Sequence, residues 1–444
     1  MNKPRKTLAL VFASLLLAVS TACASTEPSA PSSSDPQAST GGAPSSTASE
    51  SVELTYYFPV QTSGPLASAM EQIVTNFNSS HSGITVNPVF TGNYSATLEK
   101  TMTAVTAGNP PHVVLSGGTD VTTYTAVDAL YNIKDFLDAE GPEFKSDFID
   151  AFWGTFEIDG GVYGLPYQHS TPIAYYNKDL FSAAGLDPEN PPLTWEDTLT
   201  AAKKLQAANG DVIPLELSAD PWILEALAMS NGGGIVENRS TLTFDSSPSV
   251  EALSFLKTMM LDDKTAVSRK YGETSEDFIA ESTAIMYNSI GSMGAVASGA
   301  SFNWDVAPIP VSGSNLSKIP YGGGGMVMLA GHPDNETKSA WEFMKYMTTP
   351  EITAKWSMTS GYYAVRKSSY ELDEMKDYIA ELPQMQKAVD MLQNAAAPWM
   401  PEKNYGEINN RLQLAMDNCL IQGSESPSQA LAQAQQDSLE LLEK

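Results

Sequence analysis

The sequence predicts an α/β protein built as two lobes. Strand and helix patterns alternate from residue 52 to residue 115, which is typical of a largely parallel sheet covered by helices. About 420 residues follow the apolar N-terminal segment, more than one hydrophobic core normally serves. The α/β pattern returns after Gly325, which indicates that the chain crosses back to the first lobe.

The first lobe begins with a β-branched and aromatic run at 52–58, which predicts a strand. Apolar residues from Leu66 to Phe77 have helical spacing. A strand at 84–90, a helix at 96–107 and a strand at 112–115 follow. The Gly-Asn-Pro-Pro sequence at 108–111 ends that helix, because proline cannot continue it.

Helices dominate the middle and the end of the chain. Thr194 is a good N-cap, followed by acids in the first turn of a helix that runs to about Ala208. The remaining predicted elements are a helix at 249–260, strands at 284–287, 304–308 and 326–330, a helix that starts between 334 and 337 and ends at 347, and helices from 350 onward.

The N-terminus predicts export. Residues 1–22 form a signal peptide, with a basic start at Lys3, Arg5 and Lys6 and a short apolar run before a small residue. Cys23 directly follows the cut and predicts a lipidated cysteine, although Ser20 departs from the usual pattern; plain secretion is the alternative. Residues 24–51 are rich in Ser, Pro and Thr and predict a flexible tether.

Composition excludes several classes of protein. The net charge of −27 disfavours nucleic acid and anionic membrane surfaces as partners. No second long apolar stretch exists, so the only expected membrane attachment is the lipid. With Cys23 lipidated, Cys419 has no partner for a disulfide. The four histidines are scattered without metal-binding spacing, and neither a metal nor a cofactor is expected.

A polar, then aromatic segment at 165–181 is the most distinctive part of the sequence. Here the chain resembles the solute-binding proteins of bacterial ABC importers, in the large carbohydrate-handling family, and most of all its glycerol-3-phosphate-binding members. The resemblance covers nearly all of 52–440. Its other motifs are Thr91-Gly92-Asn93-Tyr94, Thr106-Ala107-Gly108-Asn109-Pro110-Pro111, Ala183-Ala184-Gly185-Leu186-Asp187-Pro188, Gly291-Ser292 and Thr359-Ser360-Gly361-Tyr362.

The resemblance implies a periplasmic-binding-protein-like fold of type II, similar to maltose-binding protein, with hinge crossovers and an interlobe cleft. Lobe 1 is expected at 52–172 plus 326–362, and lobe 2 at 173–325 plus 363–444. The implied function is capture of a small solute by a monomer, which closes and docks on a membrane permease. Since such a receptor would diffuse away from a cell without an outer membrane, we expect a Gram-positive-type bacterium and an anchor on the outer face of its membrane.

The ligand contacts of the family transfer only in part. A family glutamate falls on about Gly118, with Asp120 the nearest acid, and the phosphate-holding arginine falls on about Asn404. The complete set of implied ligand-binding residues is Tyr94, Gly118, Asp120, Ser170, Trp222, Ser289, Gly323, Tyr362 and Asn404.

Loss of the arginine predicts a neutral solute, because only a guanidinium offers a planar fork for phosphate. A sugar, oligosaccharide or polyol is therefore expected. The alternative is glycerol-3-phosphate or a glycerophosphodiester, with Lys403 or Arg411 in place of the arginine.

Each site residue also has a structural interpretation. Trp222 is equally suited to the core, Asp120 to capping a helix near Thr122, and the serines to closing turns. The glycine run at 322–325 suits a flexible crossover better than an anion cradle. A secreted glycoside hydrolase is the competing class, since two carboxylates among 52 acids would suffice; no G-x-S-x-G or metal motif supports an enzyme.

Overall fold

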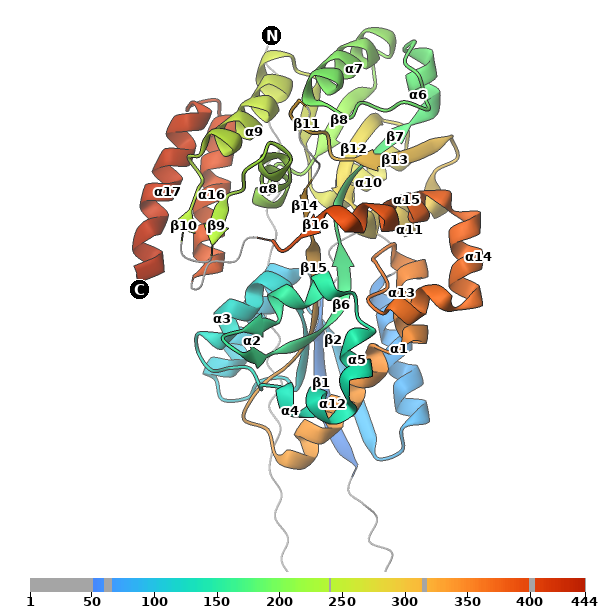
Figure 1. Ribbon diagram of the computed structural model, residues 1–444, viewed down its shortest axis with the longest axis vertical. Coiled ribbons are helices and arrows are strands. Elements are labelled where there is room, and N and C mark those ends of the chain that lie inside the picture. Colours follow the sequence, from blue (N-terminus) through green and yellow to red (C-terminus); the bar gives the residue numbers. More distant parts are fainter. Residues whose placement is uncertain (1–50, 60–65, 239–240, 314–317, 399–403, 444) are drawn as a thin grey trace, which may run out of the picture. The chain divides into compact units, whose positions relative to one another are not determined.

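The computed structural model describes residues 51–59, 66–238, 241–313, 318–398 and 404–443. The predicted signal peptide, Cys23, the tether up to residue 50 and Lys403 lie outside these described residues. The described residues belong to one compact unit, Ser49–Lys444. Two five-stranded sheets within it form the centres of two lobes (Figure 1).

The first sheet has the order β2-β1-β3-β15-β6. Strands β1, β2 and β3 are parallel, and β15 runs antiparallel to both of its neighbours. The strands are β1 (Val52–Phe58), β2 (Ile84–Phe90), β3 (Val113–Gly117), β6 (Gly164–Ser170) and β15 (Gly322–Met328). The helices of this part are α1 (Leu66–Ser80), α2 (Tyr94–Thr106), α3 (Val121–Thr125), α4 (Lys134–Glu140), α5 (Pro142–Ser146), α12 (Asp334–Met347) and α13 (Pro350–Ser360).

Alternation along β1 explains how this sheet is covered on both faces. Leu54, Tyr56 and Phe58 are buried in one cluster with the apolar stripe of α1 and with α12. Tyr57 points to the other face, where it packs in a separate cluster with Leu98 of α2. Successive residues of a strand face opposite sides, so a strand that is covered on both faces needs apolar or aromatic residues at successive positions. The predicted strand at 52–58 is confirmed.

The second sheet has the order β11-β8-β12-β7-β13, with β7 antiparallel to both neighbours. Its strands are β7 (Pro172–Asn177), β8 (Ile213–Leu217), β11 (Ala266–Ser268), β12 (Thr283–Ser289) and β13 (Trp304–Pro308). The surrounding helices are α6 (Lys178–Ala183), α7 (Trp195–Ala208), α8 (Pro221–Ser230), α9 (Ser247–Lys257), α10 (Tyr271–Ile279), α11 (Met293–Gly299), α14 (Asp373–Glu381), α15 (Pro383–Met391), α16 (Tyr405–Leu420) and α17 (Pro427–Glu443). Short strand pairs complete the described elements: β4 (Glu157–Ile158) with β5 (Gly161–Val162), β9 (Val236–Asn238) with β10 (Thr241–Leu242), and β14 (Ile319–Pro320) with β16 (Ala395–Ala396).

The chain leaves the first sheet at Thr171 and returns to it at Gly322, earlier than the expected residue 326. The predicted flexible crossover at 322–325 is wrong, because these glycines form the first half of β15. Their lack of side chains is required by packing: a Cβ on Gly323 would lie 1.9 Å from the Gln168 carbonyl oxygen, and one on Gly324 1.8 Å from that of Ser116. In the described part of the chain, no helix combines the length and the apolar character needed to cross a bilayer.

Candidate functional site

A cavity of about 500 Å³ lies at the carboxyl ends of β3, β6 and β12. The first residues of α2, α8, α10 and α16 also line it, so the walls come from both sheets and their helices. Strand carboxyl ends and helix N-termini are the places where α/β proteins commonly bind ligands, because backbone N–H groups there lack partners.

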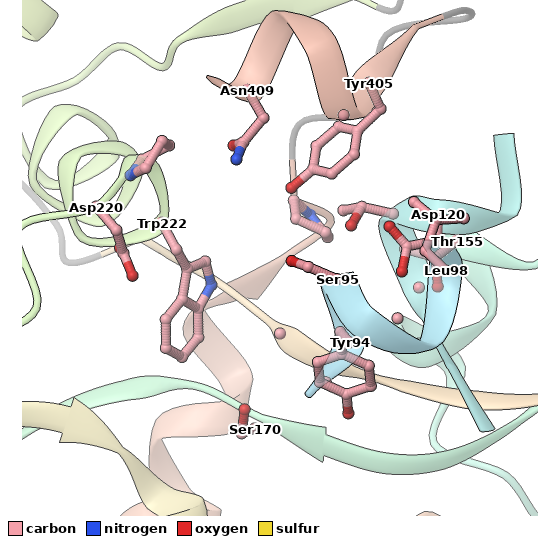
Figure 2. Close-up of a pocket in the computed structure, with 18 of the residues that line it drawn as sticks. Tyr94, Ser95, Leu98, Asp120, Thr155, Ser170, Asp220, Trp222, Tyr405 and Asn409 are labelled. Atoms are coloured by element: carbon pink, nitrogen blue, oxygen red, sulfur yellow. The ribbon is translucent and has the colours of Figure 1, made fainter. Parts of the chain in front are cut away.

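Eight of the nine predicted ligand contacts line this cavity, and Asn404 does not. Figure 2 shows four of the eight, contributed by different elements, around the same space. The eight are Tyr94, Gly118, Asp120, Ser170, Trp222, Ser289, Gly323 and Tyr362. Contact of these residues with a solute remains a prediction.

Tyr94 is the first residue of α2, whose start is fixed by Asn93: its side chain accepts a hydrogen bond from the backbone N–H of Ala96 at 2.9 Å. Gln168 Nε2 on β6 donates to the Tyr94 hydroxyl at 2.6 Å. Burial, reinforced by the neighbouring Tyr362, raises the pKa of Tyr94 well above its ordinary value. The hydroxyl is therefore neutral at physiological pH and suited to hydrogen bonding with a polar molecule.

Asp120 ends the 3-10 turn η1 (Gly118–Asp120) that follows β3. Its side chain is 7% exposed and makes no capping hydrogen bond to α3, so the interpretation as a helix cap is not supported. Burial raises the pKa of Asp120 to about 7, against the opposing effect of a hydrogen bond from the Gly117 backbone. A buried carboxyl group thus lines the cavity, and its pKa lies near physiological pH.

His169 and Ser170 come from the end of β6, where Ser170 pairs in register with Gly322. The His169 ring stacks on Phe152 at 4.2 Å and donates from Nδ1 to the Gly322 carbonyl at 3.0 Å. Burial lowers the pKa of His169 to about 3, so the ring is neutral. These contacts give His169 a structural role.

Trp222 is held in place from two sides. Asp220 caps α8 by accepting from the Ile223 N–H at 3.1 Å, and its other oxygen accepts from the Tyr271 hydroxyl at 2.6 Å. The Tyr271 ring meets Trp222 edge-on at 6.1 Å, and a Cβ on Gly322 would lie 2.8 Å from the indole. The ring is therefore part of the cavity wall, with Nε1 buried and unpartnered among the described residues.

Ser289 combines both interpretations given to it. Its Oγ accepts from the Gly291 N–H at 3.0 Å and so closes the turn after β12, while the residue also lines the cavity. Tyr362 packs over the same turn, because a Cβ on Gly291 would lie only 2.8 Å from its ring. The glycine in this motif is thus explained by the close approach of the tyrosine.

Helix α16 contributes residues that the sequence analysis missed. Tyr405, Asn409 and Gln413 lie four residues apart, hence on one face, and all three line the cavity. Figure 2 shows Tyr405 and Asn409 there. This regular spacing of polar side chains is visible in the sequence, and the three residues could have been predicted from it. Asn404 precedes the helix with a φ of 55°, and its amide donates to the Leu441 carbonyl at 2.7 Å on α17. It is therefore turned away from the cavity.

The described lining is acidic and contains neither lysine nor arginine. Arg411 does not line the cavity and instead pairs with Glu407 at 2.9 Å. Lys403, the other proposed substitute for the phosphate-holding arginine, lies outside the described residues. The acids of the lining are Glu99, Asp120, Asp220 and Glu225.

A second polar cluster, His112, His332 and Glu336, has ligand atoms within 4.8 Å of one another, at the opposite end of β3. Its hydrogen bonds do not suit a metal. The Thr55 N–H donates to His112 Nδ1, so Nε2 carries the proton that it donates to Glu336 at 3.0 Å. A metal on Nε2 would require a proton on Nδ1, which would then oppose the Thr55 N–H. The cluster joins β1, β3 and α12 instead, with His332 Nε2 donating to the Pro111 carbonyl at 3.1 Å.

Comparisons with known proteins agree with this architecture. Residues 72–384 match the family described as bacterial extracellular solute-binding protein. The sn-glycerol-3-phosphate-binding periplasmic protein UgpB of Pectobacterium atrosepticum is 28% identical over 391 residues, covering 84% of this chain and 87% of its own.

Solved structures share the fold. UgpB from Mycobacterium tuberculosis in complex with glycerophosphocholine superposes with a TM-score of 0.78 at 22% identity, covering 87% of this chain and 97% of its own. Maltose-bound MalE3 of T. maritima also has a TM-score of 0.78, at 18% identity over 87% and 98% of the two chains. The expected two-lobed, maltose-binding-protein-like fold is confirmed. The chain belongs to the bacterial extracellular solute-binding proteins, and it is a binding protein of an ABC importer rather than an enzyme.

Proposed function

We propose that this protein captures a sugar, oligosaccharide or polyol in the cavity and delivers it to its permease. The observation that carries the proposal is the chemistry of the described lining, which combines aromatic rings, hydroxyls, amides and carboxylates without lysine or arginine. Sugars present an apolar ring face and a rim of hydroxyls, so this mixture suits them, whereas an anion lacks a cationic partner here.

The proposed contacts divide between a platform and a polar rim. Trp222 and Tyr362 supply flat apolar surface, while Ser170, Asn409 and Gln413 supply hydrogen-bonding groups. A volume of about 500 Å³ is within the usual range for small-molecule pockets.

Binding is proposed to close the lobes over the solute. The Tyr405 hydroxyl on α16 already hydrogen-bonds to Thr119 of the turn after β3, so the two walls meet on one side of the cavity. A solute that contacts both walls favours the closed form by its differential affinity for it. The closed form is then recognised by the permease.

The test is a thermal-shift screen of the mature chain with sugars, oligosaccharides and polyols, followed by calorimetric titration of the positives. Saturable heat without chemical change is expected. Release of product from any glycoside would instead support the hydrolase interpretation. Absence of binding across the whole panel would contradict the proposal.

A glycerol phosphate or glycerophosphodiester is the second candidate. It is favoured by the names of the relatives, which describe binders of sn-glycerol-3-phosphate and a complex with glycerophosphocholine. The N-termini of α2 and α10 at the cavity offer backbone N–H groups to a phosphate in place of the arginine. Titration with glycerol-3-phosphate and glycerophosphocholine beside maltose separates the two candidates, because a phosphate site would leave maltose unbound.

The remaining part of the proposal concerns location. Cys23 is proposed to carry a lipid that holds a monomer on the outer face of the cell membrane of a Gram-positive-type bacterium, beside its permease. Metabolic labelling with a fatty acid should mark the native protein and not a Cys23→Ala variant. Equal labelling of both, or of neither, would contradict the anchor.

A further inference from the structure

The first-lobe wall of the cavity contains a buried carboxyl group, Asp120, and a buried hydroxyl, Thr155. Asp120 is 7% exposed and Thr155 is 1% exposed, and both line the cavity (Figure 2). They pack on consecutive glycines: a Cβ on Gly117 would lie 2.7 Å from Asp120 Oδ2, and one on Gly118 would lie 2.9 Å from Thr155 Oγ1. Side chains at these two positions would displace both groups, so the glycines leave room for each of them at the cavity wall.

Neither group is fully paired within the protein. Thr155 Oγ1 is buried without a hydrogen-bond partner among the described residues. Asp120 receives a hydrogen bond from the Gly117 backbone, and no ion pair involving it occurs in the described part of the chain. An unpaired hydroxyl and an uncompensated carboxylate are both costly in a buried site, which indicates that a ligand completes them.

Among the described residues, the titratable groups facing Asp120 supply no positive charge. They are Tyr94 from α2, Tyr124 from α3 and Tyr405 from α16. Burial raises the pKa of all three, so they are neutral near pH 7. A cationic group on the ligand would supply the counter-charge that the described residues lack around an ionised Asp120.

We infer that the solute carries a protonated primary amine, which donates hydrogen bonds to the Asp120 carboxylate and to Thr155 Oγ1. This inference rests on the proposed function and narrows its solute to a hydroxylated compound with an amino group. A neutral hydroxyl in the same place would pair with the oxygens but leave the charge uncompensated. A quaternary ammonium would balance the charge, but it has no N–H to donate.

The experiment compares ligands of similar size with and without an amine. The β-1,4-linked disaccharide of glucosamine is titrated beside cellobiose, and glycerophosphoethanolamine beside glycerophosphoglycerol, with the mature chain. The amine member of the recognised pair should bind about tenfold tighter or more, as expected for a charge-assisted hydrogen bond. For glycerophosphoethanolamine, whose amine stays protonated over this range, the preference should grow from about pH 5.5 to about pH 7.5, because burial raises the pKa of Asp120 to about 7.

Two variants and one control assign the effect to this pair of groups. Asp120→Asn removes the charge at nearly constant shape and should reduce the amine preference to parity, and Thr155→Val should reduce it in part. Asp135→Asn removes an exposed charge on α4, outside the cavity, and should keep the full preference. It controls for the general acidic field of the protein.

The outcomes separate the inference from the function on which it rests. Equal affinity for the amine and neutral members, or an amine preference that survives Asp120→Asn, would overturn the inference while leaving the importer function intact. No binding by either pair or by the wider sugar and polyol panel would overturn the proposed function, and the inference with it.

Discussion

Trp222 shows how a single side chain becomes a binding surface through its neighbours. Its position depends on Tyr271, which is oriented by a hydrogen bond to the Asp220 carboxylate, and on Gly322, which leaves room for the indole. These partners come from α10, the start of α8 and β15, so no local sequence signal distinguishes this tryptophan from a core residue.

Trp222→Ala should weaken solute binding by about 1–3 kcal/mol, since a large apolar face against the solute is lost. Calorimetric titration measures the change. Trp195→Ala is the control, because that ring stacks on Phe255 away from the cavity and should affect stability alone. Unchanged affinity in the Trp222 variant would remove this residue from the site.

Asp120 connects the pH dependence of stability to the cavity. Its pKa is about 7 in the folded protein and 3.8 in an unperturbed aspartate. The folded state therefore holds the proton more tightly, and the stability associated with it is complete below about pH 4 and is lost as pH rises through 7.

The substitution Asp120→Asn should remove this loss of folding stability with rising pH. Without solute, the variant should match the native protein near pH 4 and exceed it above pH 7 by up to roughly 4 kcal/mol, at about 1.4 kcal/mol per pKa unit. Denaturant unfolding at several pH values measures the difference. Asp211→Asn, at an exposed position, should show no such divergence. Parallel pH profiles for Asp120→Asn and the native protein would refute this assignment.

At the scale of elements, β15 is the strand that joins the lobes, and its glycines are fixed by the neighbouring backbones. Gly324→Ala would bring a Cβ to 1.8 Å from the Ser116 carbonyl oxygen on β3, a contact that only displacement of the strand can relieve. We expect a loss of at least about 3 kcal/mol in the free energy of unfolding, at the upper end for overpacking.

The matched control is Gly272→Ala on α10, where a Cβ meets no atom within 4 Å. It should be neutral or slightly stabilising, because alanine favours helix more than glycine does. Chemical denaturation of both variants tests the contrast. Similar stabilities of the two variants would mean that β15 accommodates a side chain at position 324 without being displaced.

Helix α16 illustrates which part of the site was predictable. The helix was expected, and the spacing of Tyr405, Asn409 and Gln413 is visible in the sequence. Transfer from the family pattern selected Asn404, one residue before the helix. Asn404 has a φ of 55°, so its side chain points in a different direction from that of Tyr405. The transfer was therefore wrong by one residue, and it selected a side chain that contacts α17 instead of the cavity.

For the whole molecule, binding should appear as both closure and stabilisation. A saturating solute should lower the radius of gyration in X-ray scattering, because it bridges walls from both lobes. At a concentration of about 100 times Kd, it should add about 2.7 kcal/mol to the free energy of unfolding by mass action. Stabilisation without compaction would mean that binding does not draw the lobes together.

The sequence by itself determined the class of fold, the order of most elements and eight of the residues that line the cavity, since local periodicity and family motifs carry that information. The missing arginine also led to the prediction of a neutral solute. Only the tertiary structure decided that the glycine run is a packed strand, that Trp222 faces the cavity and that Asn404 does not. It alone brought Asp120 and Thr155 to the same cavity. These outcomes depend on contacts between residues distant in the chain, where burial and backbone approach decide which way a side chain points and whether its charge is paired.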